Sequence, residues 1–342
     1  MTRFTAPAEE APHRGTWMCW PSRMEVYTYD GRPSGYGDEV MQTIGRLAAA
    51  IAEHEPVFMC APAHLQDLAR DHCGDQVTLL AIDTDDMWAR DTGPVFVAGD
   101  NGRAGVTFSF NAWGGKMDLP VDATLARRVL GHQNIPEITA GITGEGGGIE
   151  YDGDGTLLLT ESCWVNDNRN PGLTRDQIEY ELRRVLGVEQ VIWLQGVAGA
   201  EETDGHIDGY VRFIRPGLVM MSGAGRDDPN WGGDTIWHRD YDDAKARLQQ
   251  AHDAKGRKLE IVELPWATQC RSDDARFFTS YANFYVGNGA VYSPQFGDDA
   301  ADARAEATLR DLFPGRKIVM LDVDRIYENG GGIHCVTQQE PA

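Results

Sequence analysis

Apolar residues recur every three or four positions in six segments of this chain, which is the period of an amphipathic helix. The segments cover residues 38–55, 64–74, 122–132, 174–188, 238–256 and 299–315. The fourth begins with Thr174 and has Gln177 three residues later, as in a capping box. The pattern therefore predicts six helices.

Five of these helices end near a glycine that leads into a run of β-forming residues. The glycines are Gly74, Gly131, Gly187, Gly256 and Gly315, and they lie 57, 56, 69 and 59 residues apart. The near-constant spacing indicates five copies of one helix-to-strand module. Five modules in one chain favour a closed radial α/β arrangement, and a doubly wound parallel sheet is the alternative.

Glycine-rich segments connect the predicted elements, and most of them are typical of hairpin turns. They cover residues 99–105, 144–148, 152–155, 287–289 and 330–332. The chain has no low-complexity linker between them. We therefore expect residues 1–342 to form a single domain.

The charge balance narrows the class of ligand. Lys and Arg number 31 against 53 Asp and Glu, which gives a formal net charge of −22. Nucleic-acid binding needs clustered basic residues, so we expect no nucleic-acid partner, and a small cation would be attracted instead. No apolar run has the roughly 18 residues of a membrane span, and no signal peptide is recognisable, so we expect a cytoplasmic protein without a membrane partner.

Polar clusters follow the first, second, third and fifth predicted strands. They occupy residues 88–94, 144–148, 203–208 and 330–335. In a radial arrangement equivalent loops converge on one axis, so their side chains would form one site. The side chains that would meet there are Asp91, Glu145, His206, Asp208 and Cys335.

This set combines a thiol, an imidazole and three carboxylates. A thiol beside an imidazole is an activated nucleophile, and neighbouring carboxylates require a cation to offset their repulsion. A guanidinium offers carboxylates a matching fork of N–H donors. The set therefore favours attack by sulfur on the carbon of a guanidinium held by carboxylates. Trp88, three residues before Asp91, could stack on such a cation.

Each residue also has a simpler interpretation. Cys335 could be a buried thiol, and His206 with Asp208 could be a hydrogen-bonded pair on an edge strand. The six cysteines include no CxxC pair, and the chain has no HExxH motif, so we expect no catalytic metal. The glycine-rich loops do not match a nucleotide-binding motif, so we expect no nucleotide binding.

Several longer motifs together resemble one known family. They are WARDTGP at 88–94, EGGG at 145–148, GHIDG at 205–209, SYANFYVGNGAVYSPQFGD at 280–298 and GGGIHCVTQQEP at 330–341. In this order they are similar to the agmatine deiminases, a branch of the guanidine-modifying (pentein) superfamily shared with bacterial peptidylarginine deiminases. The resemblance implies a five-bladed, pseudo-symmetric α/β propeller without a cofactor. It makes a homodimer the default expectation.

The resemblance also implies residue roles and a reaction. Cys335 would be the nucleophile, His206 the general acid and base, and Asp91, Glu145 and Asp208 the polar ring around them. Trp88 and Gly332 would line the substrate pocket. The enzyme would be a hydrolase of carbon–nitrogen bonds in linear amidines, converting agmatine to N-carbamoylputrescine and ammonia, a step toward putrescine. Three alternatives stay open. The enzyme could act on another guanidino substrate, such as free or peptidyl arginine, or it could transfer the amidino group. The protein could also be a non-catalytic binder of cationic amines.

Some positions depart from the family pattern. Asn329 stands before the glycines near the nucleophile, Glu150 stands where relatives often have His, and residues 24–39 differ from the usual sequence. We therefore expect an altered rim around an intact catalytic set. A substrate with a carboxylate would need a basic partner, for which the candidates are Arg14, Arg23, Arg169 and Arg325. The three carboxylates should also raise the pKa of the thiol and favour a protonated imidazole in the empty site.

Overall fold

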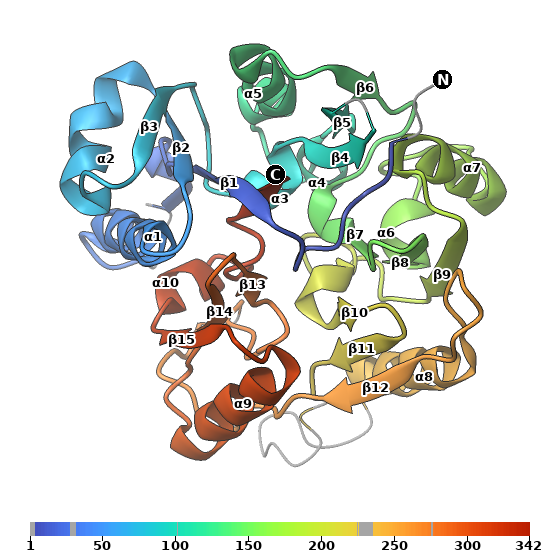
Figure 1. The fold of residues 1–342 in the computed structure, drawn as a ribbon. Helices are drawn as coiled ribbons and strands as arrows, with labels where there is room; N and C mark the ends of the chain where they lie inside the picture. The colour runs from blue at the N-terminus through green and yellow to red at the C-terminus, as the bar shows by residue number, and fades with distance from the viewer. Residues whose placement is uncertain (1–3, 28–31, 101, 224, 226–234, 275) are drawn as a thin grey trace.

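Five small β-sheets surround a central axis and the chain passes through them in order (Figure 1). This computed structural model describes residues 4–342 except 28–31, 101, 224, 226–234 and 275. The fold is the expected five-bladed α/β propeller. Within the described residues, no helix has the length and apolar character that crossing a membrane would need.

Each sheet combines an antiparallel pair of strands with a third strand that runs parallel to its neighbour. The first sheet has the order β16-β1-β2-β3, and the others are β4-β5-β6, β7-β8-β9, β10-β11-β12 and β13-β14-β15. The strands are β1 (His13–Cys19), β2 (Val57–Ala61), β3 (Thr78–Ala81), β4 (Val95–Gly99), β5 (Gly102–Thr107), β6 (Glu137–Thr139), β7 (Ile149–Tyr151), β8 (Thr156–Thr160), β9 (Gln190–Leu194), β10 (Val211–Arg215), β11 (Leu218–Met221), β12 (Glu260–Glu263), β13 (Tyr285–Val286), β14 (Ala290–Pro294), β15 (Lys317–Leu321) and β16 (Gln338–Pro341).

All six predicted helices are present. They are α1 (Tyr36–Ala52), α2 (Gln66–Cys73), α5 (Leu125–Gln133), α7 (Arg175–Leu186), α8 (Ile236–Gln250) and α9 (Asp299–Leu312). The capping box at Thr174 and Gln177 is confirmed. Helix α8 ends six residues before the predicted boundary at 256, because Asp253 accepts backbone hydrogen bonds from Lys255 and Arg257 and so forms a turn.

The five predicted helix-to-strand junctions lead into β3, β6, β9, β12 and β15, each the parallel strand of its sheet. Gly187, for example, ends α7 with φ 68°, a conformation that glycine adopts without steric cost. The second junction differs in detail. Gly131 lies inside α5, and Asn134 takes the left-handed position with φ 54°.

Short helices and turns connect these elements and carry the polar clusters. The short α-helices are α3 (Ala89–Thr92), α4 (Ala112–Gly115), α6 (Glu161–Trp164) and α10 (Asp324–Tyr327). The 3-10 turns are η1 (Met24–Tyr27), η2 (Ala63–Leu65), η3 (Asp122–Thr124), η4 (Gly146–Gly148) and η5 (Ile207–Gly209).

The glycine-rich segments divide into two kinds. Those at 99–105, 152–155 and 287–289 connect antiparallel strands, as predicted, although residue 101 lies outside the described residues. Those at 144–148 and 330–332 are not hairpins. The first leads into η4 and β7, and the second follows α10 and precedes Cys335. Neither of them therefore joins two strands of one sheet.

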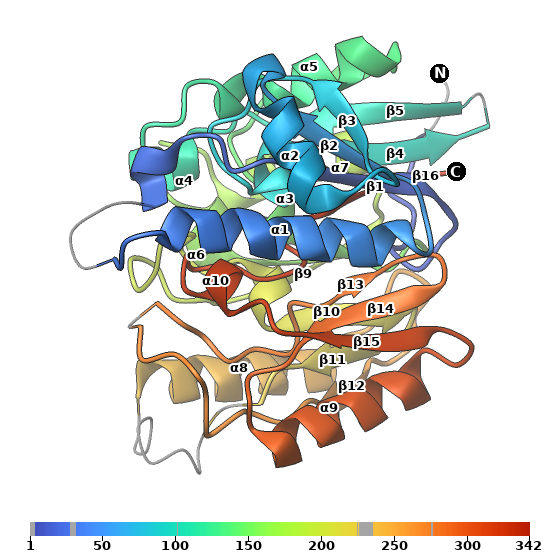
Figure 2. The same ribbon diagram turned by 90° about the vertical axis from the view of Figure 1, so that its left-hand side faces the viewer.

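The two faces of the ring differ. In the view turned by 90° the C-terminal end of the chain lies on one side, and α4 and α10 lie on the opposite side (Figure 2). Residues 4–12 cross the ring as an irregular segment: Thr5 bridges Ala98 of β4, and Ala6 donates a hydrogen bond to the carbonyl of Leu186 (Figure 1). This segment therefore connects separate modules before β1 begins.

Candidate active site

The five side chains expected at the axis do converge there. Asp91 comes from α3, Glu145 precedes η4, His206 and Asp208 lie at η5, and Cys335 precedes β16. All five residues are buried.

Gly147 marks the point where three of these side chains meet. A Cβ on Gly147 would lie 2.7 Å from Nδ1 of His206, 2.8 Å from Oδ1 of Asp91 and 3.2 Å from Oδ2 of Asp208. The backbone N–H of Gly147 donates a hydrogen bond of 3.0 Å to Oδ1 of Asp91. Side chains from two modules, at α3 and η5, therefore surround a backbone position of a third module that has no room for a side chain.

His206 lies between two carboxylates. Its Nε2 is 3.1 Å from Oε2 of Glu145, and its Nδ1 is 3.7 Å from Oδ1 of Asp91. Burial lowers the pKa of His206, but Asp91 and Glu145 outweigh burial and raise it well above its ordinary value. The ring is therefore an imidazolium, as expected.

Asp91 is held by donors from two directions. Besides the Gly147 amide, the indole Nε1 of Trp113 donates a 2.9 Å hydrogen bond to Oδ2 of Asp91. Burial is the main reason that the pKa of Asp91 is raised, and the neighbouring Asp208 adds to it. Trp113 in α4 was not predicted; it has φ 56°, an uncommon backbone conformation for a bulky residue.

The carboxylate of Glu145 is bound by the guanidinium of Arg169. Nε of Arg169 lies 2.9 Å from both of its oxygens, and the same guanidinium reaches Oδ2 of Asp204 at 2.8 Å. Burial raises the pKa of Glu145, but the hydrogen bond from His206 and the charge of Arg169 outweigh it, so the pKa is lowered. Glu145 thus stays ionised and contacts His206.

The expectation that Arg169 could meet a substrate carboxylate is wrong. Its side chain is completely buried and bonded to Glu145 and Asp204, so it belongs beneath the site. The other three candidates are ion-paired as well, each at 3.0 Å or less: Arg14 with Glu340, Arg23 with Glu25, and Arg325 with Glu39 and Glu328.

The thiol of Cys335 faces Asp208. Its Sγ lies 3.5 Å from Oδ2 of Asp208 and 3.2 Å from Nδ2 of Asn283. Burial, followed by the charges of Asp208 and Asp91, raises the pKa of Cys335 well above its ordinary value. The expectation of a raised thiol pKa is therefore confirmed.

Asn283 supports the loop that carries His334 and Cys335 and was also not predicted. Its Oδ1 accepts the backbone N–H of His334 at 2.9 Å, so the amide bonds both the loop and the thiol. A Cβ on Gly332 would collide with this oxygen and with the hydroxyl of Tyr327. A backbone hydrogen bond from Gly332 acts to lower the pKa of Cys335, so Gly332 lies against the sulfur.

Trp88 lies beside the nucleophile loop. Its indole Nε1 donates a 3.0 Å hydrogen bond to Oδ2 of Asp86, and its ring packs against the backbone of Gly331. The ring is therefore fixed next to the segment that carries Cys335, where an aromatic wall was expected.

The expected changes at the rim fall in different places. Glu150 is not a rim residue: it is buried in β7, where Nε of Arg212 lies 3.0 Å from its Oε2 and the amide of Phe213 donates to Oε1. Asn329 is half-buried and donates to the hydroxyl of Tyr36. Within residues 24–39, positions 28–31 lie outside the described residues.

A second thiol lies on the far side of Glu145. Sγ of Cys163 is 3.8 Å from Oε2 of Glu145, and the residue has no exposed surface. Ligand atoms of Glu145, Cys163 and His206 lie within 4.8 Å of one another, which is a donor set that a metal such as Zn²⁺ accepts. Arg169 already bonds both oxygens of Glu145, so a metal there would have to displace an ion pair.

Comparison with known proteins places this geometry in a family. Residues 5–341 match the family described as Porphyromonas-type peptidyl-arginine deiminase. The chain belongs to this family. The agmatine deiminase of Stutzerimonas stutzeri (strain A1501) is 39% identical, with 99% of this chain and 96% of that protein covered. The agmatine deiminase of Medicago truncatula is 36% identical with the same coverage.

The fold of the family agrees with the propeller described above. A solved structure of the agmatine deiminase of Enterococcus faecalis superposes with a TM-score of 0.89 and 31% sequence identity, covering 99% of this chain and 96% of that one. The resemblance of the motifs to this branch of the guanidine-modifying enzymes is thereby confirmed.

Proposed function

We propose that this protein hydrolyses the guanidino group of agmatine to N-carbamoylputrescine and ammonia, through an amidino-thioether on Cys335. The observation that carries the proposal is the thiol beside two buried carboxylates, Asp91 and Asp208, which approach one another across Gly147. A guanidinium placed there would neutralise both carboxylates and bring its central carbon to the sulfur. The agmatine deiminases among the relatives support this substrate.

The reaction follows from the positions of the groups. Asp91 and Asp208 orient the guanidinium, and the thiolate of Cys335 adds to its carbon. His206 then protonates one amino nitrogen, the carbon–nitrogen bond breaks, and ammonia leaves behind an amidino-thioether. In the second half His206 takes a proton from water and the hydroxide adds to the same carbon. The carbon–sulfur bond then breaks while the added hydroxyl group loses its proton to solvent, which releases the ureide and the thiolate.

We assign supporting roles to the groups around these residues. Glu145 holds the ring of His206, because its oxygens face that ring and Arg169. Gly332 and Asn283 hold the sulfur, and Trp88 forms a wall of the pocket. Neither half-reaction requires a metal or cofactor.

The substrate itself helps to form the thiolate. In the empty site the pKa of Cys335 is raised by burial and by Asp208 and Asp91, so the sulfur is protonated at neutral pH. A bound guanidinium cancels the charge of those carboxylates and lowers the thiol pKa. We expect the ultraviolet absorbance of the thiolate to rise when a guanidine binds at pH 7, and an unchanged absorbance would contradict this step.

Internal ion pairs favour agmatine over free arginine. Arg14, Arg23, Arg169 and Arg325 are each bonded to an acid of this chain, so none of the four is presented to a substrate carboxylate. The net charge of −22 also attracts a substrate that carries a second cation. We further propose that residues 1–342 act as one catalytic domain in the cytoplasm, as a homodimer, without nucleic-acid or membrane partners.

The test is product analysis with three cysteine variants. Ammonia and ureide mass would be measured with agmatine, arginine, an N-acylated arginine peptide and guanidinobutyrate. We expect agmatine turnover that Cys335→Ser abolishes and that Cys270→Ser, at an exposed cysteine, leaves unchanged. Loss of turnover in Cys163→Ser but not in Cys335→Ser would assign the nucleophile to Cys163. Turnover of another guanidine instead of agmatine would make that compound the substrate. A new guanidine as product would indicate amidino transfer.

A further inference from the structure

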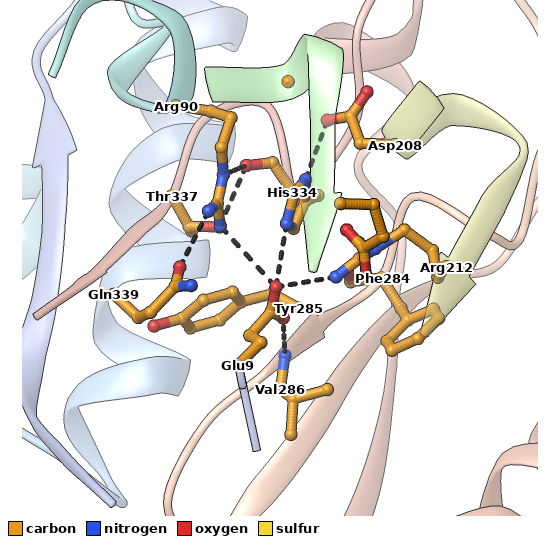
Figure 3. Close-up of polar contacts among 12 residues, drawn as sticks. Glu9, Arg90, Asp208, Arg212, Phe284, Tyr285, Val286, His334, Thr337 and Gln339 are labelled. Atoms are coloured by element: carbon orange, nitrogen blue, oxygen red, sulfur yellow. Dashed lines mark hydrogen bonds and ion pairs between the residues drawn. The ribbon is translucent and has the colours of Figure 1, made fainter. Parts of the chain in front are cut away.

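His334, the residue before the proposed nucleophile, bonds two carboxylates at once. Its Nδ1 lies 2.7 Å from Oδ2 of Asp208, and its Nε2 lies 2.8 Å from Oε2 of Glu9 (Figure 3). Its side chain is 2% exposed. The ring is therefore held by a carboxylate on each of its two nitrogens.

Glu9 is ionised in this setting. Arg212 donates to its Oε2 at 2.6 Å, the backbone N–H of Val286 donates to its Oε1 at 2.8 Å, and Arg90 lies 3.9 Å away (Figure 3). Burial raises the pKa of Glu9, but Arg212 and His334 outweigh it and hold the pKa well below its ordinary value.

Asp208 is ionised for a related reason. Burial raises its pKa, whereas the hydrogen bond and charge of His334, followed by His206 and Arg212, lower it below the ordinary value. The oxygen that His334 binds is the same oxygen that lies 3.5 Å from Sγ of Cys335. The imidazole therefore fixes the carboxylate beside the reacting sulfur.

Glu9 lies in the irregular segment that crosses the ring, 325 residues before His334. Among the described residues, no hydrogen bond or ion pair joins Glu9 to Asp91, His206, Asp208 or Cys335, so Glu9 acts on the reaction through its partners, of which His334 is the one that bonds Asp208. This arrangement separates Glu9 from the groups that contact substrate.

We propose that Glu9 and His334 are positioning residues for the deimination, in which Glu9 fixes the His334 ring and His334 aims the Asp208 carboxylate at the guanidinium. The proposal rests on the proposed function of the site. The proposal gives the segment before β1 a role in the reaction besides its contacts between modules.

The charged and titratable groups around Asp208 and His334 determine the pH dependence that the test measures. Asp208 is faced by His334, His206, Arg212, Asp91, Cys335 and Tyr327. His334 is faced by Asp208, Glu9 and Glu150, and Arg90 donates to its backbone carbonyl.

The first variant is Glu9→Gln, which keeps the size of the side chain. Its oxygen can accept the Val286 amide, but its NH₂ group cannot accept a hydrogen bond from Nε2 of His334. The ring then loses the partner that fixes it opposite Asp208, and its hydrogen bond to Asp208 weakens. The pKa of Asp208 rises, so we expect the acidic limb of kcat/KM to move upward by about one pH unit.

Two substitutions of His334 separate orientation from charge. In His334→Asn the amide nitrogen occupies the position of Nδ1 and still donates to Asp208, whereas in His334→Gln it occupies the position of Nε2 and donates to Glu9. We expect His334→Asn to keep kcat within about tenfold of the wild type and His334→Gln to lose about a hundredfold. The double variant of Glu9→Gln with His334→Asn should lose no more than His334→Asn alone, because both act through one imidazole.

Glu55→Gln is the matched control. Glu55 is a buried carboxylate that also bonds a histidine, with Oε1 at 3.2 Å from Nδ1 of His13, but it does not contact the site. We expect this control to lower the melting temperature without moving the pH profile. If the three carboxylate and histidine variants change activity only in proportion to their melting temperatures, as the control does, the positioning role is wrong.

A spectroscopic readout keeps this test independent of turnover. In protein labelled with ¹⁵N-histidine, the ring nitrogen signals of His334, assigned by their loss in His334→Asn, should shift in Glu9→Gln and stay in place in Glu55→Gln. Signals of His334 that Glu9→Gln leaves unchanged would overturn the proposal even if agmatine is hydrolysed. A wild type that produces no ureide but shows this response would refute the proposed function and leave the contact between Glu9 and His334 in place.

Discussion

Gly147 offers a direct test of how the site is packed. A substitution by alanine adds one methyl group at the point where His206, Asp91 and Asp208 meet, at 2.7, 2.8 and 3.2 Å from the new carbon. Ordinary contacts of a Cβ begin near 3.4 Å, so the imidazole nitrogen would have to retreat by about 0.7 Å. Gly147 does not have a left-handed φ, so the alanine itself adds no backbone strain.

The expected effect is catalytic rather than structural. A displacement just below 1 Å of a catalytic group costs on the order of a hundredfold in rate, which corresponds to about 2.7 kcal/mol of transition-state stabilisation. Overpacking a buried position costs about 1–3 kcal/mol of folding stability, which a chain of this length tolerates. We therefore expect kcat/KM for agmatine to fall at least a hundredfold in a variant that still folds.

The assay is ureide formation as a function of agmatine concentration, accompanied by urea unfolding. Gly131→Ala is the control, because Gly131 lies in helix α5, has no atom within 4 Å of its added Cβ, and should gain about 0.5–1 kcal/mol in stability. If Gly147→Ala keeps more than a third of the wild-type kcat/KM, the three side chains do not form the reactive site in this arrangement.

Two further predictions concern buried charges. Arg169→Met should lower the free energy of unfolding by about 3–5 kcal/mol, because it leaves Glu145 buried without the guanidinium that bonds it. Arg184→Met, at a half-exposed pair with Glu181, should lower it by about 1 kcal/mol or less. Urea unfolding measures both. Burial raises the pKa of Asp122 to about 7. The folded state therefore keeps a proton that the unfolded state releases near pH 4. The free energy of unfolding should fall by up to about 4 kcal/mol as the pH rises from 4 to 7. Asp122→Asn should lose that slope when both proteins are unfolded in urea at pH 5 and 7.5, and an equal slope in the two would refute the assignment.

The fold and the reacting groups could be predicted because their signals are local. Helical periods, terminal glycines and β-rich runs each lie within about 20 residues, and their repetition is enough to predict five modules. Once the modules are placed on a ring, the loops carrying Asp91, His206 and Cys335 have to meet, so the residues predicted from these loops are the residues that the structure brings together.

The supporting groups could not be found in the same way. Arg169 bonds Glu145 across 24 residues and Asn283 bonds Cys335 across 52, both from segments without a regular period. Their partners depend on how loops of different modules pack, which no local pattern determines. Glu150 was expected at the rim because it follows a site motif, but it lies in β7, where its carboxylate meets Arg212 of β10.

The position of Cys335, the proposed nucleophile, links the proposed reaction to the closure of the ring. Cys335 lies just before β16, and β16 pairs with β1 in the sheet that contains the first module. The pairing is reinforced by Glu340, which accepts the indole hydrogen bond of Trp17 at 2.8 Å and an ion pair from Arg103 at 2.9 Å. Because the last strand has to close onto the first before Cys335 reaches Asp208, the active site is assembled only in the closed ring, and a destabilised β16 would remove activity before the other blades unfold.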